Sequence, residues 1–339
     1  ISLVNWAATQ LVLPRTLPRL DFSKGIPPHA RTLVVVPTMF GNTATLAALA
    51  EALEVRFLAN RDENLHFALL TDFFDADAAV MPGDQALLDA AQREIDALNL
   101  RYAPEHRNRF FLFHRPRLWN PRERRFIAHE RKRGKLAALN RFLRRGTGDD
   151  FLRIVGDTDR LGHVRYVITL DTDTQLPRDA GRKFAGTLAH PLNRARFDEK
   201  RNRITRGYGI LQPRVGTSMS GQRRSWYARI HGTEPGLDPY TRAVSDVYQD
   251  LFAEGSFVGK GIYDVDAFEH ALHQRFPDNS VLSHDLLEGC YARAGLVSDV
   301  QLYEDYPARY SVDVKRRHRW IRGDWQLLPF MLDGKRYPL

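Results

Sequence analysis

Short apolar runs alternate with segments of helical apolar spacing over the first two-thirds of the chain. The apolar runs predict strands at residues 33–36, 65–70, 109–113, 166–170 and 207–211. Apolar residues three and four apart predict helices at residues 43–58, 82–100 and 133–145. Runs that are apolar throughout are typical of a parallel sheet covered by helices on both faces. The pattern therefore predicts an α/β fold with a mostly parallel, Rossmann-like sheet.

The pattern becomes less regular beyond residue 214. Further segments are predicted as helices near 221–231 and 241–253, a Gly–Pro loop at 232–239, a glycine-rich extended stretch at 256–264, a helix at 285–294, a strand at 297–303 and a basic helix from 311. No internal repeat or low-complexity linker separates these segments. We therefore predict one domain at residues 31–310, with flanking segments at 1–30 and 311–339.

Composition supports a folded protein but leaves the partner class open. Hydrophobic residues make up 43% of the 339 residues, and Cys290 is the only cysteine, which excludes an intramolecular disulfide framework. A reducing, cytosolic environment fits this usage. The formal net charge of +9 suits a nucleic-acid binder, a protein at an anionic membrane, or an enzyme of phosphorylated substrates. Charge alone does not choose among them.

The two ends of the sequence combine apolar residues with tryptophan and arginine. Residues 1–13 include Trp6, and residues 320–332 include Trp325 beside a basic cluster. Neither segment has the roughly 18 to 20 apolar residues that span a bilayer. Both suit amphipathic segments at a membrane interface, and both equally suit packing on the domain. Because residue 1 is Ile, we expect the sequence to begin inside a longer chain.

Two carboxylates follow the predicted strand at 166–170. In parallel α/β sheets ligands bind beyond the carboxyl ends of the strands, where Thr38, Asp72, residues 114–117 and Asp171 to Asp173 fall. Asp171 and Asp173 are two positions apart, so in extended chain both point to one side. Magnesium prefers oxygen ligands and substrate phosphates, so the pair suits a metal–diphosphate complex. A polar turn is the alternative.

Lysine and asparagine frame the start of the predicted helix at 133–145. Lys135 lies in its first turn, where a helix amino terminus attracts phosphate, and Asn140 follows one turn later. The leucines of this helix fit a core-facing stripe. The alternative is therefore an ordinary amphipathic helix in which Lys135 has no ligand.

Asp285 opens another predicted helix, after Ser283 and His284. As a general base it would take a proton from an acceptor hydroxyl, which requires a pKa above the ordinary value of about 3.9 or a late proton transfer. The alternative is a helix cap, with Asp285 at the N-cap and Glu288 three residues on. The two roles are compatible.

The basic segment 315–323 carries two further candidates for ligand binding. Arg317 and Arg319 could clamp a diphosphate, and Trp320 offers a flat face to a sugar ring. A basic helix at a membrane or nucleic acid is the alternative.

The order of these elements resembles the processive inverting glycosyltransferases of GT-A fold, which include cellulose and hyaluronan synthases. The family's KAGALN element is similar to residues 135–140, its DxD to Asp171 and Asp173, its TED to residues 283–285, and its QRxRW to residues 316–320. Two positions depart from the pattern: Arg316 replaces glutamine and His284 replaces glutamate. Residues 17–27, 282–289 and 316–326 more closely resemble the glycosyltransferase domain of bacterial cyclic β-1,2-glucan synthases.

This resemblance implies UDP-glucose as donor, Mg²⁺ or Mn²⁺, inversion at the anomeric carbon and a β-1,2-glucan acceptor and product. It also implies a large multi-pass parent protein with this domain on the cytoplasmic face of the inner membrane. We expect no nucleic-acid partner. On this resemblance, Thr38 and Asp72 would border the uridine pocket, and Asp171, Lys135, Arg317 and Arg319 would contact the diphosphate. Asp173 and Asp171 would bind the metal. Asp285 would be the catalytic base, His284 would adjust it, and Trp320 would stack on the acceptor sugar.

Two other functions stay open at this point. One is a nucleotide-sugar enzyme of another outcome, either a transferase making a different linkage or a nucleotidyltransferase. The other is a non-enzymatic basic module that binds membranes or nucleic acid. The ordered acidic positions disfavour the second, because binding to a phosphate backbone does not require them.

Overall fold

The computed structural model describes residues 2–12, 15–103, 108–218, 225–231, 243–281 and 284–332. The chain divides into two compact units, residues 22–172 and residues 1–21 together with 173–339. The predicted loop at 232–239, the start of the helix expected near 221–231 and Ser283 lie outside the described residues. One domain over 31–310 stays a prediction.

Residues 22–172 form a mostly parallel sheet with the strand order β7-β1-β2-β3-β6. Its strands are β1 (Thr32–Phe40), β2 (Leu65–Phe73), β3 (Phe110–Arg115), β6 (Arg153–Val155) and β7 (Tyr166–Thr169). β7, β1, β2 and β3 are parallel, and β6 is antiparallel at the edge. β1, β2 and β3 are almost fully buried, as their apolar sequences predict.

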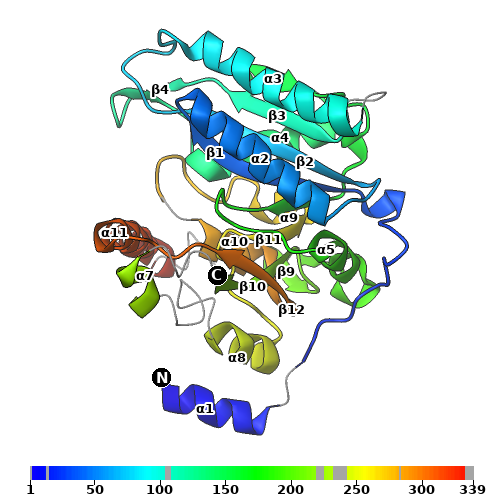
Figure 1. The fold of residues 1–339 in the computed structure, drawn as a ribbon. Coiled ribbons are helices and arrows are strands. Elements are labelled where there is room, and N and C mark those ends of the chain that lie inside the picture. The colour runs from blue at the N-terminus through cyan, green and yellow to red at the C-terminus, as the bar shows by residue number, and fades with distance from the viewer. Residues whose placement is uncertain are drawn as a thin grey trace. The chain divides into compact units, whose positions relative to one another are not determined.

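Helices flank this sheet, and two of them, α2 and α3, lie side by side (Figure 1). The helices are α2 (Thr43–Ala59), α3 (Asp84–Tyr102) and α4 (Arg131–Arg145), with short 3₁₀ turns η1 (Pro28–Ala30) and η2 (Leu161–His163). Asn42 caps α2 by accepting a hydrogen bond from the Thr45 amide at 2.8 Å. α4 ends at Gly146, whose φ of 71° is the left-handed conformation that stops helices. A small hairpin of β4 (Leu118–Asn120) and β5 (Arg125–Ile127) precedes α4.

The other unit contains a second group of strands in the order β12-β10-β11. β10 (Ile210–Thr217) pairs parallel with β12 (Ala294–Glu304) and antiparallel with β11 (Gly261–Asp264). A separate two-stranded ribbon joins β8 (Arg196–Asp198) to β9 (Arg203–Arg206). The single strand predicted at 207–211 is therefore wrong in its bounds. Gly207, with a φ of 64°, breaks the chain between β9 and β10.

The helices of this unit extend from the chain's start to its last described residues. They are α1 (Ser2–Leu11), α5 (Ala180–Ala189), α7 (Trp226–His231), α8 (Ala243–Phe252), α9 (Val265–Leu272), α10 (Asp285–Ala292), α11 (Tyr310–Gln326) and α12 (Leu328–Leu332), with a 3₁₀ turn η3 (Pro191–Asn193). α1 lies against α8, as Figure 1 shows. None of the helices in the described part of the chain has the length and apolar character needed to cross a bilayer.

The two flanking segments behave differently from each other. On α1, Leu3 and Trp6 are exposed, as an interface segment requires. At the other end Trp325 is 70% exposed, but Phe330 is 4% exposed and packs with Phe276 and Tyr291. The C-terminal segment therefore has an exposed tryptophan on α11, as an interface segment would, and also packs on the domain through α12. The predicted α/β fold with a mostly parallel, helix-flanked sheet is confirmed.

Candidate active site

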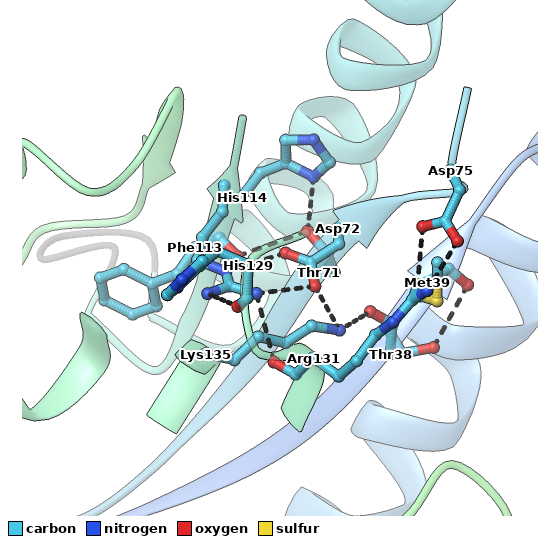
Figure 2. A network of polar contacts seen from close by, with 11 residues as sticks. Thr38, Met39, Thr71, Asp72, Asp75, Phe113, His114, His129, Arg131 and Lys135 are labelled. Carbon is cyan, nitrogen blue, oxygen red and sulfur yellow. Dashed lines mark hydrogen bonds and ion pairs between the residues drawn. The ribbon is translucent and has the colours of Figure 1, made fainter. Parts of the chain in front are cut away.

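Asp72, at the end of β2, lies at the centre of a buried network of charges (Figure 2). Its carboxylate accepts two hydrogen bonds from Arg115, at 2.9 Å from Nε and 3.0 Å from a terminal nitrogen. The ammonium of Lys135 lies 3.1 Å from the same carboxylate. Asp72 is 1% exposed, so its charge depends on these two cations for compensation. The register places Asp72 opposite Arg115 of β3, so both side chains share one face of the sheet.

Lys135 connects α4 to the ends of β1 and β2. Because α4 begins at Arg131, Lys135 lies in its second turn, and the prediction that it lies in the first turn is wrong. Its buried ammonium pairs with Asp72 and donates to the carbonyl oxygen of Thr38. Burial lowers the pKa of Lys135 to about 8. The negative charge of Asp72 opposes this shift, and the positive charges of Arg115 and Lys132 add to it. The structure thus brings together Thr38, Asp72 and Lys135, three residues that the sequence predicts to share a site.

Gly134 permits the close approach of α4 to the preceding loop. A Cβ atom at this position would lie 2.1 Å from the carbonyl oxygen of His129. Arg115 donates to that same carbonyl at 3.0 Å. A glycine before Lys135 is therefore required by packing, and it lets the loop and the helix share the Arg115 guanidinium.

Residues 114–117 make structural contacts at the end of β3, which extends to Arg115, two residues beyond the predicted strand. His114 is fully buried, its Nδ1 lies 2.8 Å from the Thr71 hydroxyl, and burial lowers its pKa to about 3. Arg117 pairs with Asp84 and donates to the Phe74 carbonyl at 2.6 Å. His114 is therefore neutral at pH 7 and part of the core.

Asp171, after β7, is held by two basic residues that the sequence reasoning did not identify. Lys132 of α4 places its ammonium 2.8 Å from the Asp171 Oδ1 atom. Arg56 of α2 donates to the backbone carbonyl of Thr172 at 2.7 Å. Arg56 is 5% exposed and stands at the edge of the apolar stripe of α2, beside Phe57. A charged residue within an apolar stripe is the sequence signal that could have identified it.

Asp173 is exposed, and the residue after it is fixed in place. Thr174 is fully buried and donates from its hydroxyl to Oε1 of Glu304 at 2.6 Å. The next amide, of Gln175, donates to the Tyr303 carbonyl at 2.8 Å. The aspartates at 171 and 173 offer only carboxylate oxygens and are both accessible to solvent, so their donor chemistry fits a hard divalent cation.

Asp285 is the first residue of α10, and its carboxylate lies against Gly259. A Cβ atom at Gly259 would lie 2.8 to 2.9 Å from the three carboxyl atoms of Asp285, and Gly259 has a φ of +82°. The cap position of α10 belongs to His284, whose side chain makes no capping hydrogen bond. The alternative role of Asp285 as an N-cap is therefore wrong, because residue 285 is already the first residue of the helix. The His284 ring packs on Phe276.

The basic residues of α11 are organised by an acid of the same helix. Asp313 is 2% exposed and binds Arg317 at 2.9 Å and Arg316 at 3.1 Å. The Tyr227 hydroxyl donates to it at 2.8 Å. Burial opposes ionisation of Asp313, but these hydrogen bonds outweigh it and lower its pKa. Asp313 was missed from the sequence, although its spacing three and four residues before the arginines was visible.

The remaining candidates of α11 lie on its outer side. Arg319 is exposed and Trp320 is half-exposed, with the Arg316 guanidinium 4.9 Å from the centre of the Trp320 ring. This cation–π contact leaves Arg316, which replaces the family's glutamine, next to the residue that we expect to stack on sugar.

Comparison with known proteins shows sequence similarity to a glucan synthase. The chain is 47% identical over 336 residues to the cyclic beta-(1,2)-glucan synthase NdvB of Rhizobium meliloti (strain 1021), covering 99% of this chain and 12% of that protein. The chain thus spans about an eighth of the relative's length. No family model matches. The expected resemblance to the cyclic β-1,2-glucan synthases is confirmed.

Two solved structures are distantly similar to this chain. TarS of S. aureus aligns with a TM-score of 0.39 and 10% identity, covering 81% of this chain and 60% of that one. An active-site mutant of LgtC aligns with a TM-score of 0.31 and 11% identity, covering 79% of this chain and 72% of that one.

Proposed function

We propose that this chain, a homologue of a segment of a cyclic β-1,2-glucan synthase, is an inverting, processive glucosyltransferase domain. It transfers glucose from UDP-glucose to the 2-hydroxyl of a growing β-1,2-glucan. The observation that carries the proposal is the cationic edge of the sheet in residues 22–172. There Lys135 links the ends of β1 and β2, and Lys132 holds the acid that follows β7. Such an edge suits a nucleoside diphosphate.

Thr38 and Asp72 border the uridine pocket in this proposal. Asp72 is already bound by Arg115 and Lys135, so its contribution is to fix the strand ends against which the nucleoside lies. Lys135 contributes positive charge near the diphosphate and holds the backbone of Thr38. The buried ion pairs keep this edge in one arrangement before the donor binds, which lowers the cost of ordering it.

Asp171 and Asp173 would hold the divalent cation, Mg²⁺ or Mn²⁺, with Asp173 as the direct ligand. When bound, the cation would neutralise charge on the departing UDP. Lys135, Arg317 and Arg319 add positive charge for the leaving group, an electrostatic contribution of the kind that accounts for much of enzymatic rate enhancement. Arg317 is set in place by Asp313, which limits the side-chain freedom that it would lose on binding phosphate.

Asp285 acts as the general base. It accepts the proton of the acceptor 2-hydroxyl while the oxygen attacks the anomeric carbon from the side opposite UDP. The bond from that carbon to the phosphate oxygen breaks, and UDP leaves with the electron pair, which inverts the configuration. Gly259 has no side chain, so its backbone lies directly against the Asp285 carboxylate. Trp320 stacks on the acceptor sugar, His284 adjusts the base, and residues 255–263 shape the acceptor channel.

The wider setting is also proposed. The chain covers 12% of its relative, so the remainder of a larger membrane-embedded protein is its expected partner, at the cytoplasmic face of the bacterial inner membrane. The exposed apolar side chains of α1 and α11, such as Trp6 and Trp325, support contact with a membrane interface. We propose no nucleic-acid partner.

Asp285→Asn tests the base in the full-length protein. UDP release and glucosyl transfer are measured with UDP-glucose, UDP-galactose and UDP-N-acetylglucosamine, each with Mg²⁺ and with Mn²⁺. We expect transfer from UDP-glucose in the wild type and its loss in Asp285→Asn. Asp266→Asn, an exposed aspartate in the first turn of α9, is the matched control and should keep wild-type activity. Full transfer by a folded Asp285→Asn protein would overturn the base assignment.

A further inference from the structure

We propose that Glu304 is a positioning residue that ties the segment of the metal-binding acid Asp173 to the loop beneath the base Asp285. Glu304 is the last residue of β12 and is 4% exposed. Its Oε1 atom accepts from two residues that are far apart in the sequence, Thr174 and Lys260. The inference rests on the proposed function and adds to it a residue outside the expected catalytic motifs.

One arm of this connection reaches Asp173. The adjoining Thr174 donates to Glu304 at 2.6 Å from inside the protein, where its side chain is fully buried. The Gln175 amide donates to the carbonyl of Tyr303, the residue before Glu304. Two successive residues after Asp173 are therefore bound to the end of β12. The position of the Asp173 backbone depends on these bonds.

The other arm reaches the loop before β11. The Lys260 ammonium lies 2.9 Å from Oε1 of Glu304, and the side chains are 13% and 6% exposed. A buried ion pair of this kind is costly to break on one side, because the remaining charge stays in a poorly solvated place. Lys260 is therefore held against Glu304, and the backbone on either side of it is held as well.

Gly259, the residue before Lys260, carries the connection to the base. Its backbone lies so close to Asp285 that a Cβ atom there would be 2.8 Å from Oδ2. On the other side of Gly259, the Val258 amide donates to the fully buried Gln212 at 2.6 Å. Gln212 and Glu304 therefore fix the loop from both sides of the glycine on which the Asp285 carboxylate lies.

A continuous series of contacts therefore joins Asp173 to Asp285. It runs through Thr174, Glu304, Lys260 and Gly259. Glu304 touches no reacting atom in this account and acts through its two partners. A shift of the loop would move the base relative to the acceptor hydroxyl, and a shift of Thr174 would move Asp173. Because misplacement of a reacting group by about 1 Å can cost on the order of 100-fold in rate, loss of the carboxylate should lower kcat more than it raises KM.

The test compares Glu304→Gln with Lys260→Met, the double variant and Glu254→Gln in the full-length protein. Glu254 is the matched control, because it pairs with Arg293 at 3.1 Å but is half-exposed. We expect Glu304→Gln to lower kcat roughly 10- to 100-fold with KM for UDP-glucose changed less than about threefold. The double variant should lose less than the product of the two single losses, since neither charge is then left alone.

Hydrogen exchange gives a readout that does not depend on activity. We expect Glu304→Gln to accelerate amide exchange at both residues 173–176 and residues 258–262, while Glu254→Gln accelerates neither. Acceleration at one segment only, or equal kcat in Glu304→Gln and the wild type, would overturn the role of Glu304. Wild-type protein that transfers no sugar while Glu304→Gln accelerates exchange at both segments would overturn the proposed function and leave the connection in place.

Discussion

The Lys132 ammonium lies 2.8 Å from Oδ1 of Asp171, and Lys132 stands one helical turn before Lys135. A protein cation thus already occupies one oxygen of the acid pair that we expect to meet a divalent cation. Metal binding at Asp171 must compete with this lysine or share the carboxylate with it. Since both side chains are partly exposed, at 31% and 40%, the pair is weak enough for such an exchange.

Removing this lysine should strengthen metal binding. In Lys132→Met we expect the affinity for Mn²⁺ without nucleotide to rise about 1.5- to 5-fold, the range that partly exposed ion pairs provide. Titration calorimetry of the full-length protein measures it. Lys132→Arg, which keeps the charge, should resemble the wild type. An unchanged or weaker affinity in Lys132→Met would show that the lysine does not compete with the cation.

Arg56 should stabilise the turn that carries Asp171. Its guanidinium donates to the Thr172 carbonyl from a buried position on α2. Arg56→Met leaves that carbonyl without its charged donor, so we expect the free energy of unfolding to fall by about 1.5 to 3 kcal/mol. Urea denaturation measures the change, with Arg93→Met on the exposed side of α3 as control. Equal stabilities of the two variants would contradict this role.

Substitution of Gly259 should be destabilising because its backbone lies against the Asp285 carboxylate. Alanine there is strained at a φ of +82° and would collide with the Asp285 carboxylate. We expect Gly259→Ala to cost about 1 to 3 kcal/mol of stability and to abolish most transfer activity. The stability cost should be smaller when Asp285→Ala is also present, since the collision is then removed. An equal cost in both backgrounds would mean that the two residues do not interact.

Donor affinity should depend on the protonation of Lys135. Its pKa is lowered to about 8, so the ammonium is charged below that pH and loses its proton above it. We expect UDP affinity to fall as pH rises through 8. Stability should change in the opposite direction. Between about 8 and the ordinary 10.5 the unfolded chain binds more protons than the folded one, so the Lys135 contribution to stability rises with pH across this window.

Lys135→Arg separates these effects, because arginine stays charged throughout. Binding titrations at pH 7 and pH 9 should show a smaller loss of UDP affinity in Lys135→Arg than in the wild type. Lys135→Met is the control that has no charge at position 135, and its UDP affinity should be equally low at both pH values. A wild type with equal affinity at pH 7 and 9 would contradict the assignment.

The sequence predicts the long strands and helices because their apolar residues repeat with the period of the element. β1, β2 and β3 are buried on both faces, and this leaves a run of apolar letters. The strands β4, β5, β8 and β9 are only three or four residues long and were missed. They are formed by pairing with a neighbour, and no run of apolar residues marks them.

The site was predictable where a motif or strand end marks it. Thr38, Asp72 and Lys135 come together because parallel strands end at one edge and α4 returns to it. Arg56, Lys132 and Glu304 were missed, since their partners are distant in sequence and only the fold makes them neighbours. The structure shows where these side chains lie, and the functional roles of all the candidate site residues stay predictions.

The linkage of the transferred glucose decides whether this chain is a β-1,2-glucosyltransferase. The full-length protein is incubated with UDP-[¹³C]glucose, a divalent cation and a short β-1,2-glucan, and the linkage of the labelled sugar is determined by NMR. We expect labelled glucose joined to the 2-hydroxyl in the β configuration, absent in Asp285→Asn and retained in Asp266→Asn. Labelled glucose in another linkage, or no transfer from UDP-glucose by folded protein, would contradict the account.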